Sequence, residues 1–240
     1  MTTPFLSIII PAYNEEQRLP NALQELTSFL EKQSYQAEVL VVENGSSDQT
    51  YDVAQEFSQK VPYVKALHEQ QSGKGRAVKA GMLAAQGQYR MFCDVDFSMP
   101  ISEINCFIPP VLEGADVAIG SREAPGAVRY DEPFYRHLTG RVFNSLVRQL
   151  ALPGLQDTQC GFKCFSGKVV EEIFPLQTMM GWSFDAEVLF IARHRGFRIV
   201  EIPISWYYNA DSRVSLIKDS WQMAADLLSI QRNANNGLYN

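Results

Sequence analysis

The stretch "LSIIIPAYNEE" (Leu6–Glu16) decides the fold class. It opens with a nearly unbroken run of apolar, mostly β-branched residues and then turns acidic after a proline. Such a run is typical of a strand buried on both faces, as in a parallel sheet. A second run, "AEVLVVEN" (Ala37–Asn44), has the same character. Between them, residues 19–30 carry leucine, alanine and phenylalanine at helical spacing, so the order predicts a parallel strand–helix–strand unit.

The same alternation continues along the chain to about Ser121. After the second strand, Ser47 or Asp48 is placed to cap a helix that runs to about Gln59. The following pattern predicts a strand at 63–69, a helix at 75–87 with Gly87 as its C-cap, and strands at 89–96 and 115–121. We therefore expect an α/β fold, a doubly wound and mostly parallel sheet with helices on both faces, in a single domain.

Composition excludes several function classes. The net charge is −6 and the pI is about 5.2, which argues against a general nucleic-acid binder. The start of the chain lacks the basic region of a signal peptide, and no apolar run reaches the length of a membrane span. The four cysteines show no metal-site spacing and are expected to be reduced thiols. We expect a cytoplasmic protein and leave open peripheral contact with the cytoplasmic face of a membrane.

The polar motifs follow the predicted strands. "PAYNEE", "ENGSSD" and "DVD" come after the first, second and fourth strands, and ligands of such sheets bind at the carboxyl ends of the strands. Asp94 and Asp96 are like charges that raise each other's pKa unless a cation lies between them. Carboxylate oxygens suit Mg²⁺ or Mn²⁺. On these residues alone, a simple turn with Asp96 capping the next element stays open.

The ensemble of motifs is more specific than any one of them. "IIPAYNEE", "VVENGSSDQT" and "DVDFS", in this order, resemble the nucleotide-sugar-binding half of family 2 glycosyltransferases of the inverting GT-A type. "GKGRAVKAGM", "DTQCGFKCF" and the stretch 182–206 resemble the polyprenyl-phosphate branch, the dolichyl-phosphate glucose synthases more than the mannose synthases. The chain departs from the usual D-D-G-S-x-D pattern, because Glu43 and Asn44 replace its two leading aspartates.

The resemblance implies an inverting transfer of a hexose, glucose from UDP-glucose, to a polyprenyl or dolichyl phosphate. GDP-mannose as the donor and a non-catalytic nucleotide-sugar-binding module remain as alternatives. Residues 1–121 are then the nucleotide-sugar-binding half of the domain, residues 122–212 its acceptor-binding half, and residues 213–240 an amphipathic helix with a tail.

On the donor side, the resemblance implies a pocket for base and ribose and a site for Mg²⁺ or Mn²⁺ at Asp94 and Asp96, with Asp96 also counted as catalytic. Lys74 does not belong to a Walker A loop, because Gly75 follows it. It stands where a glycine-rich turn enters a helix, a place that attracts anions, and we expect it to reach the donor. The pocket residues are Pro11, Tyr13, Glu15, Glu43 and Ser46.

On the acceptor side, the resemblance implies a lipid phosphate held by arginines and an acidic residue near the transferred sugar. Arginine grips phosphate with two aligned donors, and the candidates are Arg122, Arg136 and Arg141, each of which is equally compatible with a surface position. The acidic residue is Asp157, the candidate catalytic residue, whose carboxylate would accept a proton or position a sugar hydroxyl.

The C-terminal stretch 213–232 has a broad apolar face. Such a helix can lie in a bilayer interface or pack on the protein, and we favour packing for part of it, with membrane contact at its edge. The final "NANNGLYN" (Asn233–Asn240) is polar and is expected to be a frayed tail.

Overall fold

The structure is a computed structural model that describes residues 3–133, 141, 145, 147, 148, 151–208 and 216–240. Its centre is a sheet of seven strands in the order β3-β2-β1-β4-β7-β5-β8. Only β7 runs antiparallel to its neighbours, and the remaining pairs are parallel. The strands are β1 (Leu6–Ala12), β2 (Ala37–Asn44), β3 (Val64–Glu69), β4 (Tyr89–Phe92), β5 (Val117–Ser121), β7 (Lys163–Ser166) and β8 (Ile199–Pro203).

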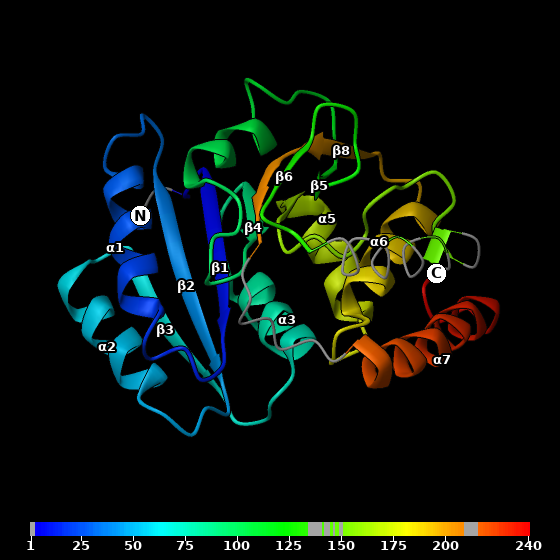
Figure 1. Ribbon diagram of the computed structural model, residues 1–240, viewed down its shortest axis with the longest axis horizontal. Helices are drawn as coiled ribbons and strands as arrows, with labels where there is room; N and C mark the ends of the chain where they lie inside the picture. Colours follow the sequence, from blue (N-terminus) through cyan, green and yellow to red (C-terminus); the bar gives the residue numbers. More distant parts are fainter. Residues whose placement is uncertain (1–2, 134–140, 142–144, 146, 149–150, 209–215) are drawn as a thin grey trace.

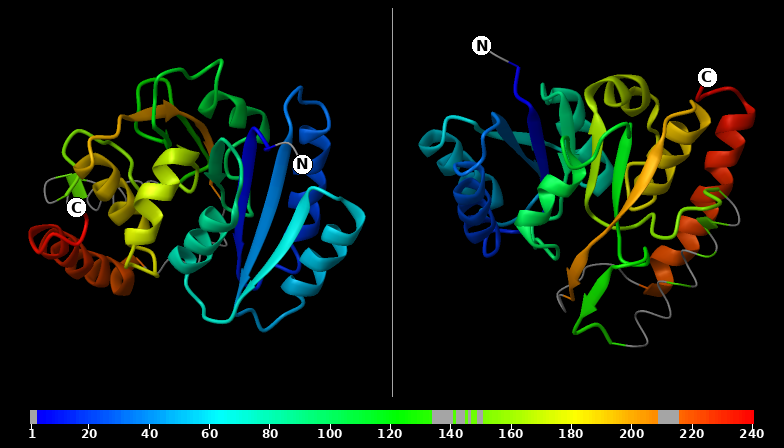
Figure 2. Two further views of the ribbon diagram at one scale, coloured as in Figure 1. Left: turned by 180° about the vertical axis from the view of Figure 1, so that it is seen from behind. Right: turned by 90° about the horizontal axis from the view of Figure 1, so that it is seen from above.

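Helices cover both faces of this sheet, as the views in Figure 1 and Figure 2 show. They are α1 (Leu19–Leu30), α2 (Thr50–Lys60), α3 (Lys74–Ala84), α5 (Gly167–Ile173), α6 (Phe184–His194) and α7 (Leu216–Asn235), with short 3-10 turns η1 (Ile101–Phe107) and η2 (Phe174–Leu176). A second small sheet pairs β6 (Val128–Tyr130) with β9 (Ser205–Tyr207). The predicted α/β architecture is therefore confirmed.

Alternate residues of the central strands serve two different cores. Ile9 and Phe92 belong to the core beneath α3, α5 and α6, whereas Ile8, Ile10 and Met91 belong to the core beneath α1. Successive side chains of a strand point to opposite faces of its sheet. The unbroken apolar run of β1 follows from this arrangement, because both faces of the strand are buried.

Two helix ends differ from the sequence expectation. Helix α3 ends at Ala84, and Gly87 is not its cap. Gly87 instead donates its backbone N–H to Ser7 Oγ at 2.8 Å, and a Cβ there would lie 2.5 Å from the same oxygen. Gly87 is thus required by a close approach of backbone to β1. Helix α2 starts at Thr50, so its N-cap position is Gln49 and not Ser47 or Asp48. The Asp48 side chain still contributes, because its Oδ1 accepts a hydrogen bond from the Thr50 N–H at 3.0 Å.

The expectation of a frayed C-terminal tail is wrong, because the end of the chain is part of the core. The Tyr239 side chain is fully buried and its hydroxyl donates to Glu187 Oε1 at 2.7 Å. Glu187 also accepts from the backbone N–H groups of Thr178 and Met179, at 2.8 and 2.7 Å. The buried carboxylate of α6 therefore ties the C-terminus to the loop before α6.

Helix α7 packs on the protein through the apolar side chains that the structure describes. Met223, Leu227 and Ile230 are buried, while Leu228 is exposed. The side chains of residues 216–221 and 224 lie outside the described part of the structure. Within the described residues, no helix has the length and apolar character needed to cross a membrane.

We predict that Tyr239→Ala lowers the free energy of unfolding by about 3–5 kcal/mol, because it removes a buried aromatic ring. Tyr239→Phe should cost about 1 kcal/mol, since Glu187 keeps its other donors. Urea unfolding measures both. Leu238→Ala, at a neighbouring exposed side chain, serves as the control and should stay within ~0.5 kcal/mol of the parent. A Tyr239→Ala protein as stable as this control would contradict the anchoring of the tail.

Candidate active site

The polar motifs meet at one edge of the sheet. Parallel pairing places Ala12 beside Glu43 at the ends of β1 and β2, and Asp94 follows the end of β4, the neighbour of β1 on its other side. The loops after these three strands therefore face the same space, at the carboxyl edge where open α/β sheets bind ligands.

The loops after β1 and β2 are joined by a ladder of hydrogen bonds. Asn14, which has a positive φ of 52°, donates its N–H to Ser46 Oγ at 3.0 Å and accepts from Ser47 N at 2.8 Å. The Glu16 N–H donates to Asp48 Oδ2 at 3.1 Å. This ladder holds together, as one unit, the two loops that carry most of the predicted base-pocket residues.

The predicted pocket residues occupy different environments in this unit. Tyr13 is 40% exposed. Pro11 lies within β1, one residue before its end. The carboxylate of Glu15 is nearly buried and forms a two-pronged ion pair with Arg18, at 2.7 and 2.8 Å. Ser46 is used in the ladder. Tyr13 thus presents an aromatic surface, whereas Glu15 is held at the start of α1.

The contacts of Glu43 and Asn44 account for the departure from the aspartate pattern at these two positions. Glu43 is buried; it accepts from Ser46 N and lies 2.6 Å from His68 Nδ1. The Asn44 carboxamide, oriented to suit its neighbours, donates to Ala12 O at 2.8 Å and accepts from Gly73 N at 3.0 Å. An aspartate could not donate to a carbonyl oxygen. Asn44 thereby links β1, β2 and the loop before α3.

The two aspartates after β4 lie against a lysine and a glycine. Lys74 Nζ is 2.5 Å from Asp94 Oδ1. Behind Asp94 lies Gly161, where a Cβ would come within 2.1 Å of Asp94 Oδ2. Asp96 accepts from Ser98 N at 3.2 Å. Burial raises the pKa of the Asp96 carboxyl, and the charge of Asp94 raises it further. The pair thus carries more negative charge than its surroundings balance.

This donor set fits a hard divalent cation. Carboxylate oxygens are the ligands that Mg²⁺ and Mn²⁺ prefer, and such ions keep positions for water and for substrate phosphates. Among the described residues, no group of three or more His, Cys, Asp and Glu gathers as a metal cage. Asp94 and Asp96 could therefore supply two ligands, with phosphate and water providing the others.

A buried ion pair lies behind the aspartates. Lys163 Nζ, on β7, is 2.5 Å from Asp185 Oδ1 and donates to Cys160 O at 2.6 Å. Both side chains are almost fully buried, and Lys163 lies over the Phe92 ring. The pair connects the segment "DTQCGFK" to the start of α6, and so sets the position of Gly161 against Asp94.

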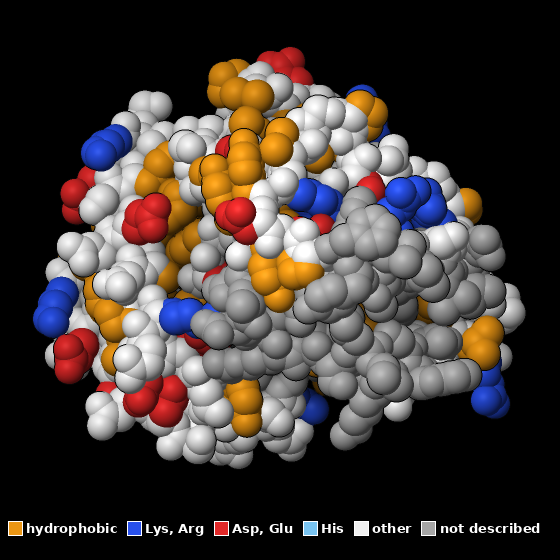
Figure 3. Space-filling model, in the orientation of Figure 1, with side chains coloured by type: hydrophobic (Ala, Val, Ile, Leu, Met, Phe, Trp, Pro, Cys, Tyr) orange, Lys and Arg blue, Asp and Glu red, His pale blue; other side chains and the backbone are white. Residues whose placement is uncertain are grey.

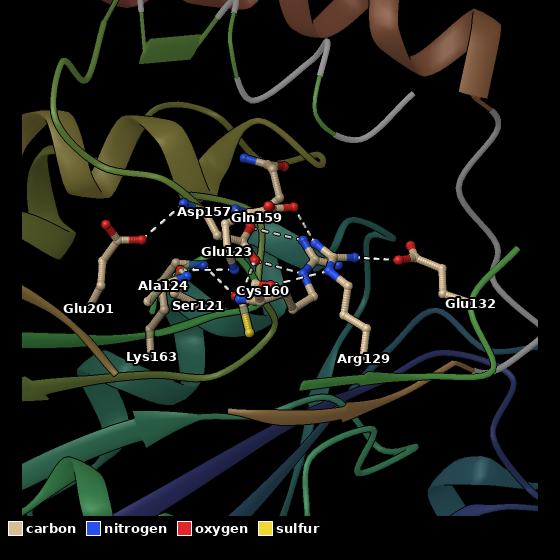
Figure 4. A network of polar contacts seen from close by, with 11 residues as sticks. Ser121, Glu123, Ala124, Arg129, Glu132, Asp157, Gln159, Cys160, Lys163 and Glu201 are labelled. Carbon is tan, nitrogen blue, oxygen red and sulfur yellow. Dashed lines mark hydrogen bonds and ion pairs between the residues drawn. The ribbon is translucent and has the colours of Figure 1, made fainter. Parts of the chain in front are cut away.

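The candidate acceptor residues Arg122 and Asp157 are bound to each other. Figure 4 shows the polar network around Asp157. Arg122 donates to the fully buried Asp157 through Nε at 2.6 Å and Nη2 at 2.9 Å. Burial would raise the pKa of Asp157, but the charge and hydrogen bonds of Arg122 hold it well below its usual range. Asp157 therefore stays ionised near neutral pH and, in this arrangement, is a weak proton acceptor.

A second arginine, which the sequence did not reveal, completes this cluster. Arg129 pairs with Glu123 at 2.6 Å and with Glu132 at 2.5 Å, and both Arg122 and Arg129 lie over the Trp206 ring. The missed signal was the occurrence of an arginine beside acidic residues twice within this short stretch, at 122–123 and at 129–132. Figure 3 shows basic and acidic side chains next to one another near the centre of one face of the molecule.

The other two predicted phosphate ligands are less defined. Arg136 lies outside the described residues, and Arg141 is exposed in a helical position. Beside Asp157, the buried atoms Thr158 Oγ1 and Gln159 Nε2 have no hydrogen-bond partner among the described residues. Buried polar atoms in proteins are nearly always paired, so the Gln159 amide nitrogen is suited to donate a hydrogen bond to a ligand, and the Thr158 hydroxyl to donate or accept one.

Comparison with known proteins places the chain in a family. The profile of "Glycosyl transferase family 2" matches residues 7–174. The chain is 32% identical to the dolichyl-phosphate beta-glucosyltransferase of Dictyostelium discoideum, over 95% of this chain and 74% of that protein. It is 33% identical to the protein of the same name from Saccharomyces cerevisiae, over 98% and 76%, and 32% identical to that from Homo sapiens, over 95% and 75%.

Solved structures agree in fold. The glucosyl-3-phosphoglycerate synthase of Mycobacterium tuberculosis, solved with Mn²⁺, UDP and glucosyl-3-phosphoglycerate, superposes with a TM-score of 0.70 at 18% identity. The superposition covers 95% of this chain and 80% of that one. The same enzyme has been solved with Mg²⁺ and UDP, with a TM-score of 0.69. From the profile match, the relatives and the shared architecture, we conclude that this chain belongs to glycosyl transferase family 2.

Proposed function

We propose that the protein transfers glucose from UDP-glucose to a polyprenyl phosphate of the dolichyl type, with inversion at the anomeric carbon. The observation that carries the proposal is the carboxylate pair Asp94 and Asp96, with Lys74 beside it, at the carboxyl edge of the sheet where the loops after β1 and β2 are hydrogen-bonded to each other. The relatives that match nearly the whole chain carry the name of this activity.

On the donor side, Tyr13 and the loops joined by Asn14 and Ser46 form the base and ribose pocket, with Glu43 at its floor. Asp94 and Asp96 would hold Mg²⁺ or Mn²⁺ on the diphosphate. A divalent cation in that place supplies positive charge for the leaving diphosphate. Lys74 adds a second positive charge on the same side.

On the acceptor side, an anionic phosphate oxygen of the lipid attacks the anomeric carbon from the face opposite the diphosphate. The new bond from that oxygen forms as the bond to UDP breaks, and UDP leaves with the electron pair. Because a phosphate monoester is already ionised near neutral pH, the reaction needs no strong general base. The pairing of Asp157 with Arg122 supports a positioning part for Asp157, with the arginine cluster turned toward the phosphate.

The acceptor lipid resides in a membrane, so we propose that the protein works against a bilayer surface. The apolar residues that the structure describes on α7 are largely committed to protein packing. The proposed contact therefore involves the acceptor side and the edge of α7.

The function is tested by incubating the purified protein with UDP-glucose and a detergent-dispersed dolichyl phosphate, and separately with GDP-mannose. We expect glucosyl lipid and UDP in equal amounts, and activity that EDTA removes and Mn²⁺ restores. Binding of UDP-glucose without product would instead support a non-catalytic binding module. Product from GDP-mannose alone would replace the donor assignment.

Asp96→Asn is expected to lower the transfer rate by at least ~100-fold, because it removes a charge needed to hold the cation on the leaving group. The fold should persist, because the raised pKa of Asp96 means that its ionised side chain is unfavourable in the folded protein, and a neutral asparagine removes that charge. The control is Asp52→Asn, at an exposed site on α2. Full activity of the Asp96 variant, with an unchanged melting temperature in both, would remove Asp96 from the reaction.

Arg122→Met should lower the free energy of unfolding by about 3–5 kcal/mol, because Asp157 would be left as a buried charge without its partner. The measurement is chemical denaturation, with the exposed Arg232→Met as the matched control. A loss no larger than that of the control would show that the pair contributes nothing to stability and is maintained for the ligand alone.

The pairing also predicts a pH dependence. Since the pKa of Asp157 is lowered in the folded protein, its stabilising contribution is present above the ordinary pKa of about 4 and is lost as the pH falls. Between about pH 5.5 and about pH 3.5, the parent should lose about 0.7 kcal/mol more stability than Asp157→Asn. Equal losses in the two proteins, from urea unfolding at each pH, would contradict this assignment.

A further inference from the structure

The ammonium group of Lys74 lies against Asp94, one of the two proposed metal ligands. Lys74 Nζ lies 2.5 Å from Asp94 Oδ1, and its side chain is less exposed than that of Asp94, 16% against 36%. The ammonium also lies over the Trp182 ring at 5.4 Å. The lysine thus places its positive charge directly against one of the two carboxylates.

The backbone that carries Lys74 cannot move easily. A Cβ at Gly73 would lie 2.5 Å from Met180 O, and one at Gly75 would lie 2.6 Å from Phe184 Cβ. Gln177 Nε2 donates to Gly75 O at 2.9 Å. The two glycines thus fit closely against the segment before α6, so the part of Lys74 that is able to relocate is its flexible four-carbon side chain.

A divalent cation and the ammonium would compete for the same carboxylate. Both are attracted by Asp94, and in a partly buried site two positive charges a few ångströms apart repel strongly. A bound nucleoside diphosphate changes this balance, because its phosphate oxygens offer the ammonium another partner within reach of the same loop. Metal binding should therefore depend on whether a diphosphate is present.

We propose that Lys74 is an exchangeable counter-ion that closes the carboxylate pair in the absence of donor and moves to the diphosphate when metal and donor bind together. This inference rests on the proposed function, since it takes Asp94 and Asp96 as the metal ligands. It makes Lys74 the residue that couples the two binding events: metal alone binds weakly, and nucleoside diphosphate strengthens metal binding.

The test measures the dissociation constant of Mn²⁺ by calorimetry, without and with saturating UDP, in the parent and in Lys74→Met. Without UDP, Lys74→Met should bind Mn²⁺ at least tenfold more tightly than the parent. The factor by which UDP strengthens Mn²⁺ binding should fall at least tenfold. Lys74→Arg, which keeps the charge, should stay close to the parent, and Lys60→Met, which removes an exposed lysine on α2, should match the parent in both measurements.

The outcomes separate this inference from the function beneath it. If the parent binds Mn²⁺ in the presence of UDP but Lys74→Met binds Mn²⁺ alone no more tightly than the parent, the counter-ion role is overturned and the proposed function stands. If the parent binds no Mn²⁺ even with UDP, both are overturned. Lys74→Gln, a second neutral replacement, must repeat the result of Lys74→Met, and a difference between them would assign the effect to packing.

Discussion

Two carboxylates at the end of one buried strand impose the main electrostatic constraint on this structure. Asp94 and Asp96 repel each other in a partly buried place, so the chain must bring positive charge to the end of β4. Lys74 supplies it directly, and the glycine at 161 lets the backbone of "DTQCGFK" lie against Asp94. The buried pair of Lys163 and Asp185 then holds that segment in place. Elements from both halves of the sequence thus converge on one carboxylate, which a single domain with a continuous sheet makes possible.

The same region explains why the end of the chain is buried. Tyr239 bonds to Glu187, and Glu187 accepts from the backbone of the loop before α6. That loop packs against Gly73 and Gly75, which carry Lys74. A path of direct contacts therefore runs from the C-terminus to the carboxylate pair. Its physical content is rigidity: each step is a buried hydrogen bond or a contact too close for a side chain, so the lysine starts from a well-defined position.

The proposed acceptor side follows a different principle, in which opposite charges are already matched. Arg122 and Arg129 each have carboxylate partners and share the face of Trp206. Arginines that are held by carboxylates and an aromatic ring lose little conformational freedom when they meet a phosphate. A phosphate bound as we propose would need donors other than those already given to Asp157 and Glu123. The nearby Thr158 Oγ1 and Gln159 Nε2, which have no partner in the described part of the chain, add neutral hydrogen-bonding groups to this side.

The sequence by itself determined the alternation of strands and helices up to Ser121 and the place of the strand-end motifs, because apolar periodicity and turn residues are local signals. It also carried the family resemblance and the candidate residues Asp94, Asp96 and Lys74. It could not show that β7 enters the sheet between β4 and β5, that Arg122 and Asp157 form an ion pair with each other, or that Tyr239 is buried. Those features join residues far apart in the chain, and only the tertiary structure decides such pairings, because they arise from burial and charge matching in space.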